Sequence, residues 1–105
     1  MRPLFIPLKT EYFNAFKTGT KTEELRPYGQ RWNESTCQIG REVILSKGYG
    51  KHERMRGRIT TFKRQHASVF GSGYRRAILA CYSTLEMDMA CIGITDLTPI
   101  PTQNG

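Results

Sequence analysis

Hydrophobic positions along the chain repeat with two different periods, one typical of helices and one typical of strands. Helical spacing begins after Thr10, a candidate N-cap, where Phe13 and Phe16 share one face and Gly19 follows as a stop. A second helical pattern covers about 75–82. Apolar stretches with strand character cover 4–8, 22–26, 42–46, about 53–62 and about 90–97.

These elements predict a single α+β domain that spans residues 1–105. We expect a small β-barrel of about five to six strands with two short helices. The chain is long enough for one hydrophobic core and too short for two. It has no internal repeat and no linker, and the proline-containing segment from about residue 99 is expected to form a flexible tail.

The basic residues are concentrated in the middle of the chain. The formal net charge is +7, and residues 47–76 hold nine Lys or Arg against the single acid Glu53. Residues 77–105 carry three acids and no base. A basic patch favours an anionic partner, with nucleic acid ahead of a membrane surface, whereas a solvated basic face is the alternative interpretation.

Cysteine usage and the N-terminal sequence indicate an intracellular protein. The three cysteines are odd in number and widely spaced, which argues against a disulfide framework and suits a reducing compartment. No C-x-x-C or H-x-x-x-H spacing is present, so we expect no metal site and no cofactor. The apolar stretch at the start of the chain is too short for a signal peptide. We therefore expect a cytoplasmic location without membrane association.

Lys21, Glu24 and Arg26 form the most informative charged group. In an extended segment Glu24 and Arg26 point to the same face, and Lys21 in the preceding turn can reach that face. A buried lysine of this kind can act as a base or nucleophile, while the carboxylate relays protons or accepts a hydrogen bond from a nucleobase. The alternative is an exposed ion-paired strand end without a function.

A row of arginines offers phosphate contacts. Arg54, Arg56 and Arg58 alternate with apolar residues, so a strand places the three guanidiniums on one face. Guanidinium groups match phosphate oxygens, and Phe62 has the same parity and would add a stacking ring. The competing interpretation is a charged edge strand that prevents aggregation.

The loop after the second strand combines aromatic and cationic side chains, namely Tyr28, Arg31 and Trp32. Bases of single-stranded RNA or nucleosides stack on such rings, although a lone tryptophan more often lies in the core. The glycine-rich stretches 47–51 and 71–74 match no phosphate-loop fingerprint, and the two histidines are expected at the surface.

The segment 8–16, which includes Lys9, resembles the opening of ASCH domains in the PUA-like superfamily. The pattern Gly-x-Lys-x-x-Glu-x-Arg that follows is similar to the family's motif, with its marked positions at Gly19, Lys21, Glu24 and Arg26. The later stretch 57–60 is also similar to the family pattern. The resemblance implies a barrel with a cleft lined by the charged residues, and binding of RNA or nucleotides. Some similar small proteins are amidohydrolases that deacetylate N4-acetylcytidine with a lysine matching Lys21, and ribonuclease activity is also proposed in the family.

Three functions remain open at this point. The first is binding of RNA or a nucleotide-like ligand, with the charged group, Lys9 and the aromatic loop around the base and the arginine row on phosphates. The second is hydrolysis of a modified pyrimidine nucleoside, or of RNA, with Lys21 and Glu24 as catalytic residues. The third is a protein-interaction module whose basic strand meets an acidic protein partner.

Overall fold

The structure is a computed structural model that describes residues 1–50 and 53–101. Five strands form one mixed sheet with the strand order β1-β3-β4-β5-β2. Its elements are, in chain order, β1 (Leu4–Leu8), α1 (Thr10–Thr18), β2 (Glu23–Pro27), β3 (Glu42–Lys47), β4 (Arg54–His66), the 3₁₀ turn η1 (Ala67–Val69), α2 (Ser72–Tyr82) and β5 (Asp88–Ile100). This confirms the α+β class, five strands and two helices.

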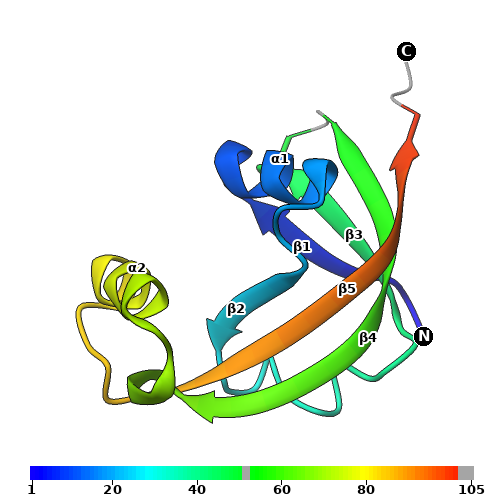
Figure 1. Cartoon of the computed structure of the whole chain (residues 1–105). Coiled ribbons are helices and arrows are strands. Elements are labelled where there is room, and N and C mark those ends of the chain that lie inside the picture. The colour runs from blue at the N-terminus through cyan, green and yellow to red at the C-terminus, as the bar shows by residue number, and fades with distance from the viewer. Residues whose placement is uncertain (51–52, 102–105) are drawn as a thin grey trace.

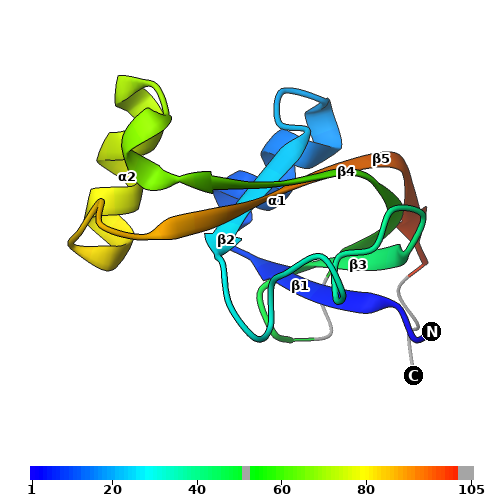
Figure 2. The same cartoon turned by 90° about the horizontal axis from the view of Figure 1, so that it is seen from below.

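The sheet is strongly curved and twisted, with α1 near one end of it and α2 near the other (Figures 1 and 2). β1 pairs with β3 in parallel, and every other strand pair is antiparallel. Ladder pairing stops at β1 on one side and at β2 on the other. The described residues therefore form an open sheet, and closure into a barrel is not confirmed.

The first helix follows the predicted pattern, with one correction at its start. Phe13 and Phe16 are buried one turn apart, and Gly19 ends the helix in the left-handed conformation, at φ 83°. Its N–H donates to the Phe16 carbonyl at 3.1 Å. The N-cap position is Lys9, with no side-chain capping bond, and the predicted cap Thr10 is already the first helical residue.

β4 and β5 are 13 residues each, longer than the sequence pattern predicted. They pair along their whole length, and Pro99 and Ile100, assigned to the tail from sequence, pair with the start of β4. The ladder is interrupted by register shifts between Arg56 and Arg58 and between Ile59 and Thr61. Such bulges add a residue to one strand and bend the sheet.

A single large core fills the concave side of the sheet. It joins both ends of the chain to the first helix, and its buried members are Ile6, Leu8, Phe13, Phe16, Trp32, Cys37, Val43, Leu45, Met55, Ile59, Ala90, Ile92 and Ile94. α2 packs on a smaller separate cluster of Ala67, Ile78 and Met89. Ile78 is the only buried residue of α2, so this helix is attached to the sheet by few apolar contacts.

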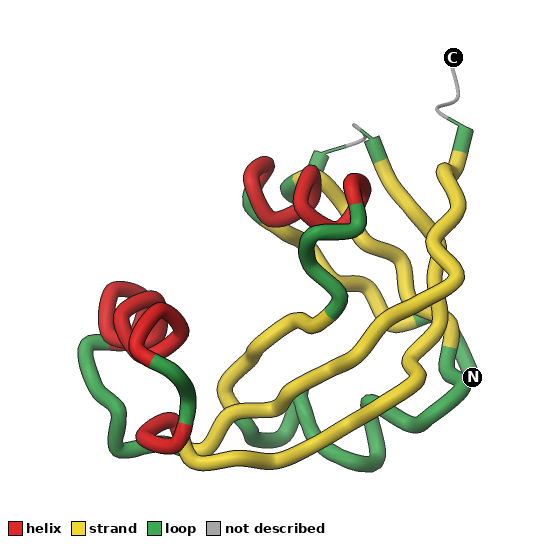
Figure 3. Tube along the Cα trace, viewed as in Figure 1, coloured by secondary structure: helices red, strands yellow, loops and turns green. Residues whose placement is uncertain are grey.

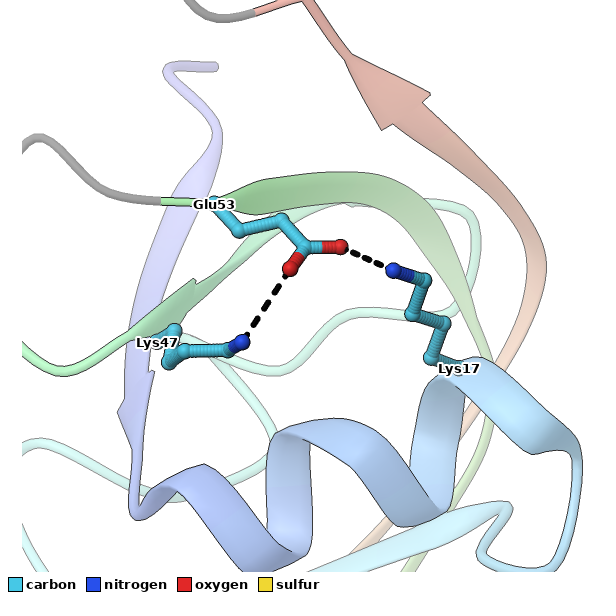
Figure 4. Close-up of polar contacts among 3 residues, drawn as sticks. All are labelled: Lys17, Lys47 and Glu53. Carbon is cyan, nitrogen blue, oxygen red and sulfur yellow. Dashed lines mark hydrogen bonds and ion pairs between the residues drawn. The ribbon is translucent and has the colours of Figure 1, made fainter.

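Two ion pairs of Glu53 connect the C-terminal turn of α1 to the β3–β4 hairpin. Glu53, just before β4, lies between Lys17 of α1 and Lys47 of β3 and pairs with both (Figure 4). The Lys47 Nζ–Glu53 Oε1 distance is 3.1 Å. The hydrogen bonds from Lys17 and Lys47 lower the pKa of the Glu53 carboxyl below its ordinary value. The trace in Figure 3 shows α1 near one end of the sheet and α2 near the other.

Candidate functional site

The segment between α1 and β2 brings the three predicted charged residues together. The Lys21 N–H donates to the Ala15 carbonyl at 3.0 Å, which folds the chain back against the helix. β2 then pairs with β5, where Glu24 lies opposite Ile92 and Arg26 opposite Ala90. The period of two therefore places both side chains on the same face, as the sequence predicted.

Glu24 lies between two cations. Its carboxylate accepts a hydrogen bond from Arg26 Nε at 2.8 Å through Oε2, and its Oε1 is 3.3 Å from Lys21 Nζ. The Glu24 side chain is 8% exposed, and the side chains of Lys21 and Arg26 are about one-fifth exposed. A buried carboxylate of this kind is stable only because both cations compensate its charge.

Aromatic rings and a backbone carbonyl fix the two cations in place. Lys21 Nζ lies over the rings of Tyr12 and Phe16, at 5.2 and 5.5 Å from their centroids. Arg26 Nη2 donates to the Pro7 carbonyl at 2.6 Å, and the guanidinium stacks 5.0 Å from the Trp32 ring centroid. These contacts fix the orientation of both cations around Glu24.

The three residues line a pocket of about 300 Å³ between the two edge strands and α2. One wall comes from the end of β1 and the start of α1, including the predicted residue Lys9. The opposite wall comes from α2, with Tyr74, Ile78 and Tyr82. Burial raises the pKa of the Tyr82 hydroxyl above its ordinary value. The pocket thus combines aromatic walls with a donor, Lys21, beside an acceptor, Glu24.

The pocket-lining tyrosines Tyr12, Tyr74 and Tyr82 were missed from the sequence as site residues. Tyr12 of α1 shares the helical spacing of Phe13 and Phe16, which predicts a core position; it does pack against the core and also lines the pocket beside Lys21. On α2 the spacing of Tyr74, Ile78 and Tyr82 marks one helical face. That face was visible in the sequence, but nothing in the sequence indicated that it lies opposite Lys21.

The aromatic loop does not reach the pocket, which corrects the expected stacking role of its rings. Trp32 belongs to the core, and the guanidinium of Arg31 lies 5.2 Å from its ring centroid on the outside. The Arg64 guanidinium lies 4.0 Å from the centroid of the Tyr28 ring, and the Tyr28 hydroxyl donates to Glu34 Oε2 at 2.5 Å. That hydrogen bond raises the pKa of Tyr28. Both rings are therefore occupied by contacts within the protein.

The arginine row lies on the outer face of the sheet and does not line the pocket. Arg54 is half-buried and Arg56 and Arg58 are exposed, while Met55, Gly57 and Ile59 between them are buried, as the alternation predicted. Phe62, expected on the arginine face, instead packs against the core. The bulge between Ile59 and Thr61 inserts one residue and reverses the parity of the strand beyond it.

The cysteines fall into two classes. Cys37 and Cys91 are buried, and burial raises the pKa of both thiols, that of Cys91 to about 11. Cys81 is exposed and lies at the pocket, on α2. A thiol reagent therefore reports on the pocket through Cys81.

Among residues 1–50 and 53–101, no group of three or more His, Cys, Asp or Glu side chains could hold a metal ion. His66 accepts a hydrogen bond from the Ser68 N–H at the start of η1, and His52 lies outside the described residues. No helix in the described part of the chain is long and apolar enough to cross a membrane.

No protein-family model, curated protein or solved structure matches this chain.

Proposed function

We propose that this chain is an ASCH-type domain of the PUA-like superfamily, an open β-barrel that binds RNA or a nucleotide in the pocket at Lys21, Glu24 and Arg26. The observation that carries the proposal is the buried carboxylate of Glu24 between two fixed cations, in the wall of a pocket of about 300 Å³. Buried charges are costly, and a protein retains them where a ligand uses them.

The pocket chemistry is complementary to a nucleobase. The Glu24 Oε1 atom has the Lys21 ammonium at 3.3 Å and keeps acceptor capacity for an amino group of a base. Glutamate accepts hydrogen bonds from the cytosine amino group in nucleic-acid complexes. Lys21 supplies a donor beside it, and Tyr12, Tyr74 or Tyr82 supplies the ring on which a base stacks.

A titration with nucleosides, nucleotides and short RNAs, followed by amide chemical shifts, tests this proposal. We expect shifts at Lys21, Glu24 and Arg26 and along α2. Binding should also slow the reaction of Cys81 with a thiol reagent, because this cysteine lies at the pocket. The buried Cys37 and Cys91 stay unreactive in both states and provide the internal control.

Substitution of Glu24 by Gln tests the assigned role directly. The change removes the charge but retains the shape, and we expect at least a tenfold loss of affinity for cytidine nucleotides (about 1.4 kcal/mol). Glu42→Gln is the matched control, because Glu42 pairs with Arg56 outside the pocket. No binding of any nucleoside, nucleotide or RNA would reject the proposal and favour a protein partner.

A second candidate function is hydrolysis of a modified pyrimidine nucleoside such as N4-acetylcytidine. It is favoured by the position of Lys21 Nζ in the pocket, 3.3 Å from a carboxylate that can shuttle a proton. Lys21 would activate water or attack the amide carbonyl, and Glu24 would carry the proton. The test is release of acetate, which Lys21→Ala should abolish while Lys63→Ala, at an exposed position outside the pocket, retains it. Turnover by a folded Lys21→Ala variant would exclude this mechanism.

A further inference from the structure

The outer face of the sheet begins at the edge of the pocket. Strand register places Pro7 of β1, Ser46 of β3 and Arg54 of β4 in one row across three strands. Residues opposite one another in a ladder point to the same side of the sheet, so these three share the outer face. Pro7 also lines the pocket. Adjacent strands are about 4.8 Å apart, so Arg54 lies about 10 Å across the sheet from a pocket-lining residue.

A second contact ties the β3–β4 hairpin to the pocket wall. The Gly48 N–H donates to the carbonyl of Leu8 at 2.9 Å, and Leu8 lines the pocket. Tyr49 follows directly and is 79% exposed. Its ring centroid is 6.5 Å from that of Phe5, over which the Arg54 guanidinium lies at 5.2 Å. We call Phe5, Ser46, Tyr49, Arg54 and Arg56 the outer arginine face.

Among the described residues, the arginines of this face make fewer hydrogen bonds than a structural arginine such as Arg41. Arg41 donates three hydrogen bonds to backbone carbonyls, with N···O distances between 2.5 and 3.0 Å. By contrast, within the described ranges 1–50 and 53–101, Arg54 makes a single long hydrogen bond, 3.3 Å from Nη2 to the Gly50 carbonyl, and Arg56 makes an ion pair at 3.5 Å with Glu42. A guanidinium has five N–H donors, and the exposed Arg56 uses none of them in a hydrogen bond to the described residues.

Two buried polar atoms on this face also have no partner among the described residues. They are Nε of Arg54 and Oγ of Ser46, which are cross-strand neighbours. Buried donors without partners are rare and costly in folded proteins. Free arginine donors beside an exposed tyrosine match a phosphate with an unpaired base next to it, since a duplex hides the faces of its bases.

We infer that the ligand is single-stranded RNA, with one nucleotide in the pocket and the adjoining strand crossing the β1 edge onto the outer arginine face. Arg54 and Arg56 contact its phosphates, and Tyr49 stacks on an unpaired base. The inference rests on the proposed function for the pocket and deepens it, because a free nucleotide would not reach the outer face. The inference also assigns phosphate binding to Arg54 and Arg56, which do not line the pocket.

The affinities for cytidine monophosphate and for an oligocytidylate test the inference. The oligomer has roughly six nucleotides, a length within the site sizes of other single-strand binders. We expect the oligomer to bind at least about tenfold more tightly. Arg54→Gln with Arg56→Gln should remove that advantage and lower the log–log salt slope by about 1.4, or 0.7 for each phosphate that the variant no longer neutralises. The affinity for the monophosphate should not change, since neither arginine lines the pocket.

Two matched controls separate this face from general charge effects. Lys63→Gln with Arg76→Gln removes the same charge from exposed positions elsewhere and should leave most of the oligomer advantage. Tyr49→Ala should lower oligomer affinity about tenfold, whereas Tyr49→Phe retains the ring and the affinity.

Each remaining outcome overturns a defined part of the inference. If the oligomer binds no more tightly than the monophosphate, or if both double variants behave alike, the outer face has no role and the pocket proposal stands. Equal affinity for the oligodeoxycytidylate overturns the choice of RNA. If neither cytidine monophosphate nor the oligomer binds to the wild-type protein, the inference is overturned, and the proposed pocket function falls with it when no other nucleoside, nucleotide or RNA binds either.

Discussion

Among the described residues, Glu24 is the only buried side chain that carries a charge. Its neighbours Lys21 and Arg26 are themselves mostly buried, so each of the three depends on the others for charge compensation. An ion pair of this kind contributes little net stability compared with apolar residues of similar size, but loss of one member leaves the others uncompensated. Stability measurements therefore report on this group independently of any ligand.

Glu24→Gln should lower the free energy of unfolding by about 3 kcal/mol, because Lys21 and Arg26 lose the carboxylate that they surround. Glu42→Gln removes an exposed ion pair at 3.5 Å from Arg56 and should cost less than about 1 kcal/mol. Urea unfolding of the two variants and the wild type gives the comparison. Equal effects of the two substitutions would contradict the description of Glu24 as a buried, compensated charge.

The charged group could be predicted from the sequence because its geometry is local. A helix stop at Gly19 and a strand period of two are sufficient to bring Lys21, Glu24 and Arg26 together. The stacking residues predicted from the sequence, Tyr28 and Trp32, do not line the pocket, because their positions depend on long-range packing. Trp32 reaches the core from a loop, and α2 reaches the pocket only through the path of β4 and β5.

At the scale of elements, the β4–β5 pair determines where α2 lies. Sequence patterns indicated the start of β4 and the centre of β5, but they missed 63–66 of β4 and both ends of β5, where the burial pattern does not alternate cleanly. The bulges were not predictable either, because a bulge depends on the partner strand. Gly93 lies at the bulge after Ile59, opposite Thr61, where a Cβ would be 2.0 Å from the Thr61 Oγ1 atom.

Gly93→Ala should therefore destabilise the protein by about 1–3 kcal/mol, as expected for overpacking. Thr61→Ala removes the clashing hydroxyl, and the double variant should recover most of the loss. Gly29→Ala is the control, because a Cβ at that glycine meets nothing within 4 Å. Thermal unfolding of the four variants and the wild type measures the coupling, and strictly additive effects of Gly93→Ala and Thr61→Ala would show that the bulge is not closely packed.

The two ion pairs of Glu53 predict that the free energy of unfolding changes in acid. Hydrogen bonds from Lys17 and Lys47 lower the pKa of Glu53 below 4.5, so the folded state favours the ionised carboxyl. Its contribution is present above about pH 4.5 and is lost as the pH falls through the lowered folded-state value. The stability difference between wild type and Glu53→Gln should therefore be visible at about pH 6 and vanish at about pH 2. A difference that persists unchanged at the lower pH would rule out this ion pair as its source.

At the scale of the whole molecule, one side chain connects the two edges of the open sheet. Arg26 on β2 donates to the Pro7 carbonyl on β1 at 2.6 Å, to Glu24 on its own strand at 2.8 Å, and stacks on Trp32. These contacts join the end of the strand order to its beginning without ladder pairing. The pocket lies at this junction, so its width depends on how firmly Arg26 holds the edges together.

Arg26→Lys keeps the positive charge but loses the planar group that donates in two directions and stacks on an indole. We expect a loss of about 2 kcal/mol in stability, from the hydrogen bonds to a charged group that disappear. Amide hydrogen exchange should become faster in β1 and β2 while the centre of β4 stays protected, because only the edges lose their connection. Arg56→Lys, on the outer face, should change neither quantity. Protected edges in Arg26→Lys would mean that the apolar core alone maintains the curvature of the sheet and the shape of the pocket.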